Sequence, residues 1–212
     1  EEAMDKEAQA RRTLEADLRD ALLRDEFELF YQPLVNLKTC ATIGVEALLR
    51  WRHPVRGLVL PEEFIAHAEE TGLIVPIGEW ALRKACADAL RWPVEIKVAV
   101  NISPIQFQKG NLVDTVIYAL AETGLDPSRL QLEITESVLL ERSERNTSIM
   151  HQLRHLGAGI VLDDFGTGFS SLLYVQHFPF NKIKIDRSFV RELPRSTSST
   201  AIICAINALA RG

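Results

Sequence analysis

The chain has 212 residues, of which 47% are hydrophobic and 25% charged, and this ordinary composition predicts one main globular domain with a sizeable core. Its formal net charge of -5 gives no overall attraction to nucleic acid polymers, so a phosphate-bearing ligand would have to be held by local cations or metal ions. Three widely spaced cysteines and the lack of an apolar run of membrane-spanning length predict a cytoplasmic protein with no membrane segment of its own, although a longer parent could be anchored in a membrane.

The first 25 residues predict an amphipathic helix, because Leu14, Leu18 and Leu22 recur at helical spacing between charged residues. Such a helix could lie on the domain that follows or connect it to an upstream one. Its start without a capping residue favours the connector. We therefore expect a linker helix in residues 1–25 and the main domain in residues 26–212.

The rest of the chain alternates between strand and helix patterns. Strands are expected at residues 27–35, 42–51, 95–102, 130–134, 160–162 and 182–185. Helices are expected from Pro61 onward, at 77–90, at 112–123, in a segment that ends at Leu156, at 170–177 and around 202–209, with a loop over 53–61. This alternation predicts a parallel sheet or a β/α barrel, in which a site would lie at the carboxyl ends of the strands.

Polar residues stand at or near the ends of five of these strands. They are Glu46, Asn101, Glu133, Asp163, Asp164 and Lys184. Four of them have an ordinary structural alternative: Glu46 could pair with a nearby arginine in the core, and the two aspartates could cap a helix or a turn. Lys184 could form a structural salt bridge with Asp163 or Asp186. The recurrence of such residues at successive strand ends favours one shared site instead.

The chemistry of these side chains predicts a site for hard divalent metal ions. Four carboxylates and one amide are oxygen ligands, and no histidine or cysteine joins them, so Mg²⁺, Mn²⁺ or Ca²⁺ fits better than zinc. Two ions bridged by an aspartate would offset the repulsion among the acids and could clamp the attacking and leaving oxygens of a phosphodiester. Lys184 could donate a hydrogen bond to a metal-bound water or a phosphate oxygen, and Glu136 could hold the loop that contains Gly166 and Gly168.

Six motifs, in this order, resemble those of the EAL-domain cyclic di-GMP phosphodiesterases. They are Tyr31-Gln32-Pro33, Val45-Glu46-Ala47-Leu48-Leu49-Arg50-Trp51, Asn101-Ile102-Ser103, Glu133-Ile134-Thr135-Glu136-Ser137, Asp163-Asp164-Phe165-Gly166-Thr167-Gly168 and Lys184-Ile185-Asp186. The tripeptide Glu-Ala-Leu alone would carry no weight, but the ordered set spans residues 27–190 and is highly specific.

The resemblance implies a modified TIM (β/α)8 barrel whose first strand runs antiparallel to the others. It also implies hydrolysis of cyclic di-GMP to pGpG with two Mg²⁺ or Mn²⁺ ions, with Ca²⁺ inhibitory. By position, the metal ligands would be Glu46, Asn101, Glu133, Asp163 and Asp164. The catalytic residues would be Glu46, Asp163, Asp164 and Lys184. Among them, Lys184 would orient the attacking water. The substrate contacts would be Gln32, Arg50 and Asp186, and Glu136 would brace the glycine loop.

The resemblance also implies partners and exposes two departures. A homodimer and an upstream GGDEF or sensory domain are expected, and the N-terminal helix is similar to the connector that follows a GGDEF domain. Asn181 stands where family members often carry an acid, a change not expected to abolish chemistry. The family draws a further glutamate and a glutamine from its last two strands, which this chain does not reach, so we expect an incomplete view of a longer chain. The alternative function is a receptor that binds cyclic di-GMP without cleaving it.

Overall fold

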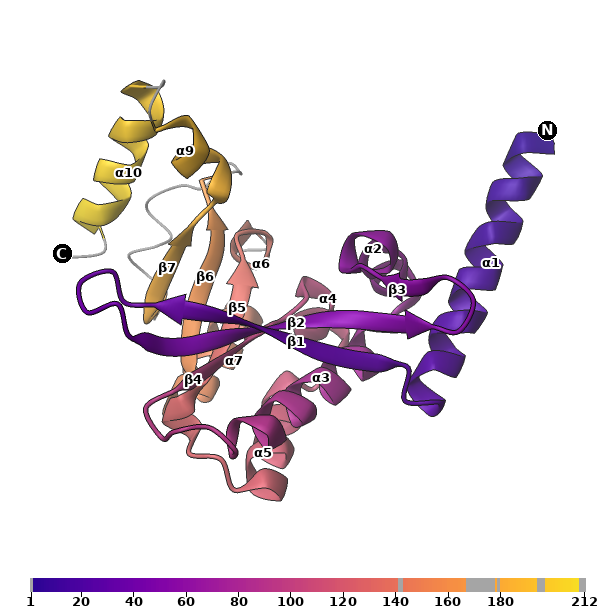
Figure 1. Ribbon diagram of the computed structural model, residues 1–212, viewed down its shortest axis with the longest axis horizontal. Coiled ribbons are helices and arrows are strands. Elements are labelled where there is room, and N and C mark those ends of the chain that lie inside the picture. The colour runs from indigo at the N-terminus through magenta and orange to yellow at the C-terminus, as the bar shows by residue number, and fades with distance from the viewer. Residues whose placement is uncertain (1, 141–142, 167–177, 179, 194–196, 210–212) are drawn as a thin grey trace.

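The computed structural model describes residues 2–140, 143–166, 178, 180–193 and 197–209. Its centre is a seven-stranded sheet made of β1 (Phe27–Val35), β2 (Thr42–His53), β3 (Gly57–Val59), β4 (Lys97–Asn101), β5 (Leu130–Thr135), β6 (Gly159–Phe165) and β7 (Lys182–Ile185). The strand order is β1-β2-β4-β5-β6-β7, with β3 paired to β2 (Figure 1). β1 runs antiparallel to β2, whereas β2, β4, β5, β6 and β7 pair in parallel. The predicted α/β fold with an antiparallel first strand is confirmed.

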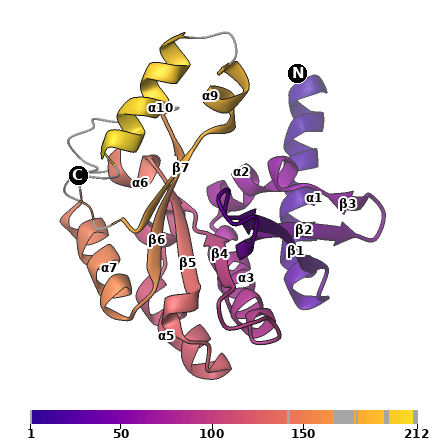
Figure 2. The same cartoon turned by 60° about the vertical axis from the view of Figure 1, so that its left-hand side comes forward.

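Helices connect the parallel strands and cover the sheet. They are α1 (Glu2–Leu23), α2 (Pro61–Thr71), α3 (Ile74–Ala89), α4 (Pro104–Lys109), α5 (Leu112–Thr123), α6 (Ser137–Leu140), α7 (Glu144–His155), α9 (Arg187–Glu192) and α10 (Thr197–Leu209), with a 3-10 turn at Pro127–Arg129. α3 packs on β4 and α5, and α7 packs on β6 and α5 (Figure 2). None of the helices described is long and apolar enough to cross a bilayer.

Alternation along the strands separates an apolar face from a polar one. Along β5, Leu130, Leu132 and Ile134 are buried in the larger apolar core, which they share with the helices. The residues between them, Gln131 and Glu133, are buried polar side chains on the opposite face. The helices therefore hold the sheet from one side, and the other side is free to carry charged groups.

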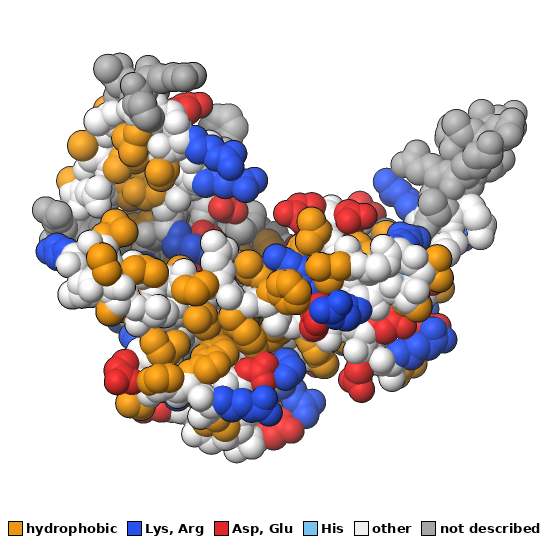
Figure 3. Space-filling view, viewed as in Figure 1, with side chains coloured by type: hydrophobic (Ala, Val, Ile, Leu, Met, Phe, Trp, Pro, Cys, Tyr) orange, Lys and Arg blue, Asp and Glu red, His pale blue; other side chains and the backbone are white. Residues whose placement is uncertain are grey.

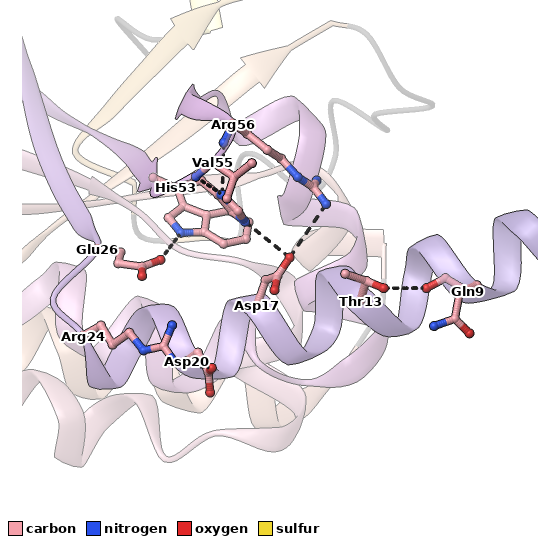
Figure 4. Close-up of polar contacts among 10 residues, drawn as sticks. Gln9, Thr13, Asp17, Asp20, Arg24, Glu26, His53, Val55 and Arg56 are labelled. Atoms are coloured by element: carbon pink, nitrogen blue, oxygen red, sulfur yellow. Dashed lines mark hydrogen bonds and ion pairs between the residues drawn. The ribbon is translucent and has the colours of Figure 1, made fainter.

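The C-terminal half of α1 packs on the far end of β2. Leu18 is fully buried in a second apolar cluster that includes Trp51. The indole Nε1 of Trp51 donates to Glu26 Oε2 at 3.0 Å, and His53 Nε2 lies 3.3 Å from Asp17 Oδ2 (Figure 4). These contacts anchor the last turns of α1 to the domain, whereas its first turns project away from it (Figure 1). The division into a linker and a main domain stays a prediction.

The predicted loop at 53–61 contains the short strand β3, so that prediction is wrong. β2 continues to His53, whose Nδ1 accepts hydrogen bonds from the backbone N–H groups of Val55 and Arg56. This closes a tight turn and brings three residues back beside β2. A strand of three residues is too short for its side-chain alternation to be recognised in the sequence.

Several helix bounds also differ from the prediction. α3 begins at Ile74 rather than at residue 77, because Pro76 lies in the first turn, where the helix needs no hydrogen bond from a proline nitrogen. α5 has the predicted bounds, and Gly124 ends it in a left-handed conformation with φ of 74°. The helix expected at 170–177 lies outside the described residues.

Candidate functional site

Carboxylates from three strands converge at one edge of the parallel sheet. Glu46, Glu133 and Asp163 each place a carboxylate oxygen so that these oxygens lie within 4.8 Å of one another. Glu46 lies in the middle of β2 rather than at its end, because β2 pairs with β4 as far as Ala47 and then continues beside β1 and β3. It is still at the carboxyl edge of the parallel pairing, where the sequence predicted a shared site.

Lys184 lies at the centre of this cluster. Its Nζ donates hydrogen bonds to Glu46 Oε2 at 2.9 Å, Glu133 Oε2 at 2.7 Å and Asp163 Oδ2 at 2.8 Å. The salt bridge with Asp163 that the sequence left open is therefore present, together with two more. One ammonium thus faces three carboxylates, and the cluster carries an excess of negative charge.

The charges and burial of the cluster shift the pKa values of its members. Burial raises the pKa of Glu133 to about 7, against the pull of Lys184. Burial also acts on Glu46, but hydrogen bonds from Lys184 and Asn101 outweigh it and lower the pKa of that carboxyl. Burial likewise opposes a charge on Lys184, yet the surrounding carboxylates raise the pKa of its ammonium.

The donor set fits a hard divalent cation. Glu133 is 1% exposed, and its Oε1 has no hydrogen-bond partner within the described part of the chain. An ionised oxygen buried in this way costs free energy unless a cation lies beside it. All the clustered donors are oxygen atoms, which Mg²⁺ and Mn²⁺ prefer.

Asn101 and Asp164 lie at the margin of the cluster. The amide Nδ2 of Asn101 donates to Glu46 Oε1 at 2.9 Å. Asp164 has φ of 52°, a left-handed conformation that aspartate tolerates better than most residues, and its backbone N–H donates to Asp163 Oδ1 at 2.9 Å. Partial burial and the nearby charges of Asp163 and Asp186 raise the pKa of the Asp164 carboxyl. The structure thus brings together the five predicted metal ligands, although Asp164 is outside the group of oxygens within 4.8 Å.

The β1–β2 ribbon adds two of the predicted substrate contacts. Gln32 is paired with Glu46 in the antiparallel register, so the two side chains lie on the same face. Arg50 follows Glu46 by four residues and lies on that face too, with its guanidinium 5.4 Å from the centre of the Phe30 ring. On this face of the molecule the surface is hollowed between the side formed by α9 and α10 and the side that carries α2 (Figure 3).

Asp186, the third predicted substrate contact, caps a helix in this structure. Its Oδ1 accepts a hydrogen bond from the backbone N–H of Ser188 at 2.8 Å at the start of α9. Hydrogen bonds from Ser188 lower the pKa of the Asp186 carboxyl. The capping alternative, which the sequence raised for Asp163 and Asp164, therefore describes Asp186 better.

Glu136 holds the start of the glycine loop. Its side chain is 6% exposed, and its Oε1 accepts a hydrogen bond from the backbone N–H of Gly166 at 2.6 Å. Gly166 has φ of 103°, and a Cβ at this position would lie 2.7 Å from the ring of Phe189, so glycine is required. Residues 167–177, which include Thr167 and Gly168, lie outside the described residues.

Sequence reasoning missed a group of polar residues beside Asn101. Ser103 begins α4, and its Oγ accepts from the backbone N–H of Ile105, while Gln106 Oε1 accepts from the backbone N–H of Ser103. The spacing Ser-x-x-Gln is the signature of a capping box and could have been recognised. The partner of Ser103 on another helix, Glu69, could not, because only the fold brings it there.

The chain is similar to bacterial signalling proteins that are much longer than it is. The EAL domain family matches residues 15–212. The uncharacterized protein y4lL of Sinorhizobium fredii is 54% identical over 211 residues, which are 100% of this chain and 26% of that protein. MucR of Pseudomonas aeruginosa, named a bifunctional diguanylate cyclase/cyclic di-GMP phosphodiesterase, is 46% identical over 215 residues, which are 100% of this chain and 31% of MucR. The chain thus spans about a quarter to a third of the length of these relatives.

Solved structures match over nearly the whole chain. The phosphodiesterase PaMucR in complex with c-di-GMP has a TM-score of 0.89 at 47% identity, over 94% of this chain and 82% of that one. The EAL enzyme Bd1971, bound to cAMP and cyclic-di-GMP, has a TM-score of 0.88 at 36% identity, over 97% of this chain and 57% of that one. These matches confirm the predicted modified TIM barrel. On its sequence, its fold and its acidic site, the chain belongs to the EAL domain family.

Proposed function

We propose that this chain hydrolyses cyclic di-GMP to the linear dinucleotide pGpG with two divalent ions, Mg²⁺ or Mn²⁺. The observation that carries the proposal is the buried Oε1 of Glu133, which has no hydrogen-bond partner among the described residues, in a cluster of three carboxylates around Lys184. A purely structural ion pair would match its charges and satisfy its oxygens. The names of the relatives MucR and PaMucR support the choice of substrate.

The side chains of the cluster divide the work of holding the ions. Glu46, Asn101, Glu133 and Asp163 would hold one ion, and Asp163 with Asp164 would hold the second. When bound, the ions supply water activation near neutral pH and charge stabilisation on the phosphate. Ca²⁺ would inhibit, because it accepts longer and more variable coordination than Mg²⁺.

Lys184 and the ribbon residues would act on the reacting groups. With the carboxylates shared between Lys184 and cations, the ammonium can donate a hydrogen bond to the attacking water and orient it. In the in-line attack, the water oxygen forms a new P–O bond and gives up a proton to solvent, while the bond from phosphorus to the 3′ oxygen breaks. The 3′ oxygen takes up a proton from solvent and leaves as a hydroxyl. Gln32, Arg50 and Asp186 would contact the dinucleotide, and Glu136 would brace the loop that starts at Gly166.

Product analysis tests this function. The full chain is incubated with cyclic di-GMP and Mg²⁺, and the nucleotides are separated by chromatography. We expect a pGpG peak that disappears with a chelator and in Glu46→Gln, which keeps the size of the side chain but removes its charge. Substrate that stays intact while binding is measurable would assign the chain to the receptor alternative.

The setting of the domain is part of the same proposal. We expect a cytoplasmic homodimer whose N-terminal helix connects it to an upstream GGDEF or sensory domain in a longer protein. The anchored last turns of α1 are consistent with a connector that transmits its position to β2. Light scattering on the full chain checks the dimer, and a monomer at all concentrations would contradict it.

A further inference from the structure

The segment that follows β4 leaves the sheet directly after Asn101. Asn101 is the last residue of β4, and its amide reaches Glu46 across the site. The next residue, Ile102, is buried, and its backbone N–H donates to Glu133 O at 2.8 Å. The chain then turns away from the sheet at Ser103. Any displacement of this turn would move the Asn101 side chain relative to the carboxylates.

Three polar side chains fix this turn from outside the site. Gln106 is 4% exposed, and its Oε1 accepts from the backbone N–H of Ser103 at 3.0 Å. Ser103 Oγ donates to Glu69 Oε1 at 2.7 Å, which ties the turn to α2. We call Glu69, Ser103 and Gln106 the polar clamp. Glu69 lies in α2 and accepts from the side chain of Ser103, whereas Gln106 lies in α4 and accepts from the backbone of Ser103, the second residue after Asn101.

Gly78 of helix α3 packs against the side chain of Gln106. A Cβ built on Gly78 would lie 2.4 Å from Gln106 Nε2, so the glutamine amide occupies the space that a side chain at residue 78 would need. Burying an amide is costly unless it is hydrogen-bonded, and Gln106 Oε1 meets this need at the backbone N–H of Ser103. Gln106 thereby completes the capping box that Ser103 Oγ begins, and the same bond fixes the backbone of the turn after Asn101.

We propose that Gln106 is a positioning residue for Asn101 and thereby sets the affinity of the site for divalent cations. It acts through the backbone of Ser103 and does not itself contact the cluster of carboxylates. The proposal rests on the proposed function in one respect, namely that the cluster binds divalent ions. Groups that orient metal ligands from a distance commonly change metal affinity when they are lost.

Mn²⁺ binding to the full chain without substrate tests the proposal. The free Mn²⁺ signal in electron paramagnetic resonance gives the dissociation constant, and thermal unfolding is followed in parallel. Gln106→Met keeps the length of the side chain but removes the acceptor, and we expect Mn²⁺ to bind about tenfold more weakly. Gln108→Met, at an exposed glutamine of the same helix, is the matched control and should bind as wild type does.

Gly78→Ala is a second variant that tests the polar clamp, through its contact with helix α3. The added Cβ would displace the Gln106 amide without altering any residue of the site. We expect a similar loss of Mn²⁺ affinity. The double variant Gly78→Ala with Gln106→Ala should bind Mn²⁺ no more weakly than Gln106→Ala alone, because the shortened side chain at residue 106 no longer clashes with the added Cβ. Independent, multiplicative losses would contradict a shared mechanism.

The outcomes separate this proposal from the enzymatic one. If Gln106→Met lowers the unfolding temperature but binds Mn²⁺ like wild type, the residue is structural and the proposal is overturned. Wild type that binds no Mn²⁺ would overturn it as well. Wild type that binds Mn²⁺ but forms no pGpG would refute hydrolysis alone, and the comparison of variants by Mn²⁺ affinity would still decide the role of Gln106.

Discussion

Two cations, the buried Arg129 and the half-buried Lys184, lie at opposite ends of the parallel strands, and their surroundings differ. At the amino ends, Arg129 is 7% exposed and donates to the backbone oxygens of Ala89 at 2.7 Å and Ile96 at 3.1 Å, with Pro93 O at 3.2 Å. At the carboxyl ends, Lys184 faces three carboxylates, one of which keeps an oxygen without a partner in the part of the chain that the structure describes. The first cation meets neutral dipoles, and the second meets an excess of charge.

This difference separates a structural group from a functional one. The carbonyls around Arg129 lie at the end of α3 and in the segment that leads to β4, and the guanidinium joins them. Those of Ala89 and Pro93 also accept from backbone N–H groups, so this cation meets only neutral partners whose geometry the backbone already fixes. The carboxylates around Lys184 repel one another and would be relieved by additional cations. We therefore expect substitutions at Arg129 to affect the free energy of unfolding and substitutions at Lys184 to affect turnover.

Lys184→Met should produce the largest effect. It removes the group that orients the attacking water, and we expect the rate of pGpG formation to fall by about 10²- to 10⁴-fold. Mn²⁺ binding should persist, because the oxygen ligands remain. Lys182→Met is the control, since Lys182 is on the same face of β7 and its Nζ contacts Gln131. Equal losses in both variants would contradict a specific role for Lys184.

Arg129→Leu should produce the next largest effect. We expect it to change the stability of the fold and not the function of the site. Several backbone carbonyls lose a hydrogen bond from a buried guanidinium, and we expect the free energy of unfolding to fall by about 3 kcal/mol in urea denaturation. Mn²⁺ affinity of the folded protein should not change. Arg83→Leu removes an exposed bidentate pair with Glu122 and should have little effect. A loss of metal affinity in Arg129→Leu would mean that the two ends of the strands are coupled.

Glu133→Gln should weaken Mn²⁺ binding yet stabilise the metal-free chain by about 1 kcal/mol, because a buried excess charge is removed. Since burial raises the pKa of Glu133 to about 7 in the folded chain, its protonated form stabilises the fold at low pH, and that stability is lost as pH rises through about 7. The advantage of the variant should therefore grow from about pH 5 to about pH 8. Denaturation with a chelator present checks this, and a constant difference would contradict it.

The sequence predicts the site residues at the ends of the strands better than it predicts the contacts between helices. Glu46, Glu133 and Asp163 stand out because acids in apolar strands need a cation, and this argument is local. β3 is too short for a periodic pattern to reveal it. The importance of Gln106 depends on Gly78, which is near it only in the folded chain, so no local pattern could reveal it.

The smallest effect is expected at Asn181, directly before β7. Asn181 Oδ1 accepts a hydrogen bond from the backbone N–H of Ile160 at 2.8 Å, and its own N–H donates to Ile160 O at 2.8 Å. An aspartate can accept the same bond, so Asn181→Asp should change stability by less than about 0.5 kcal/mol and turnover by less than about twofold. Asn181→Ala removes the acceptor and should lower the free energy of unfolding by about 1 kcal/mol while turnover per folded molecule is retained. A tenfold change in turnover for either variant would show that the amino ends of the strands influence the chemistry, which the satisfied contacts at Arg129 and Asn181 argue against.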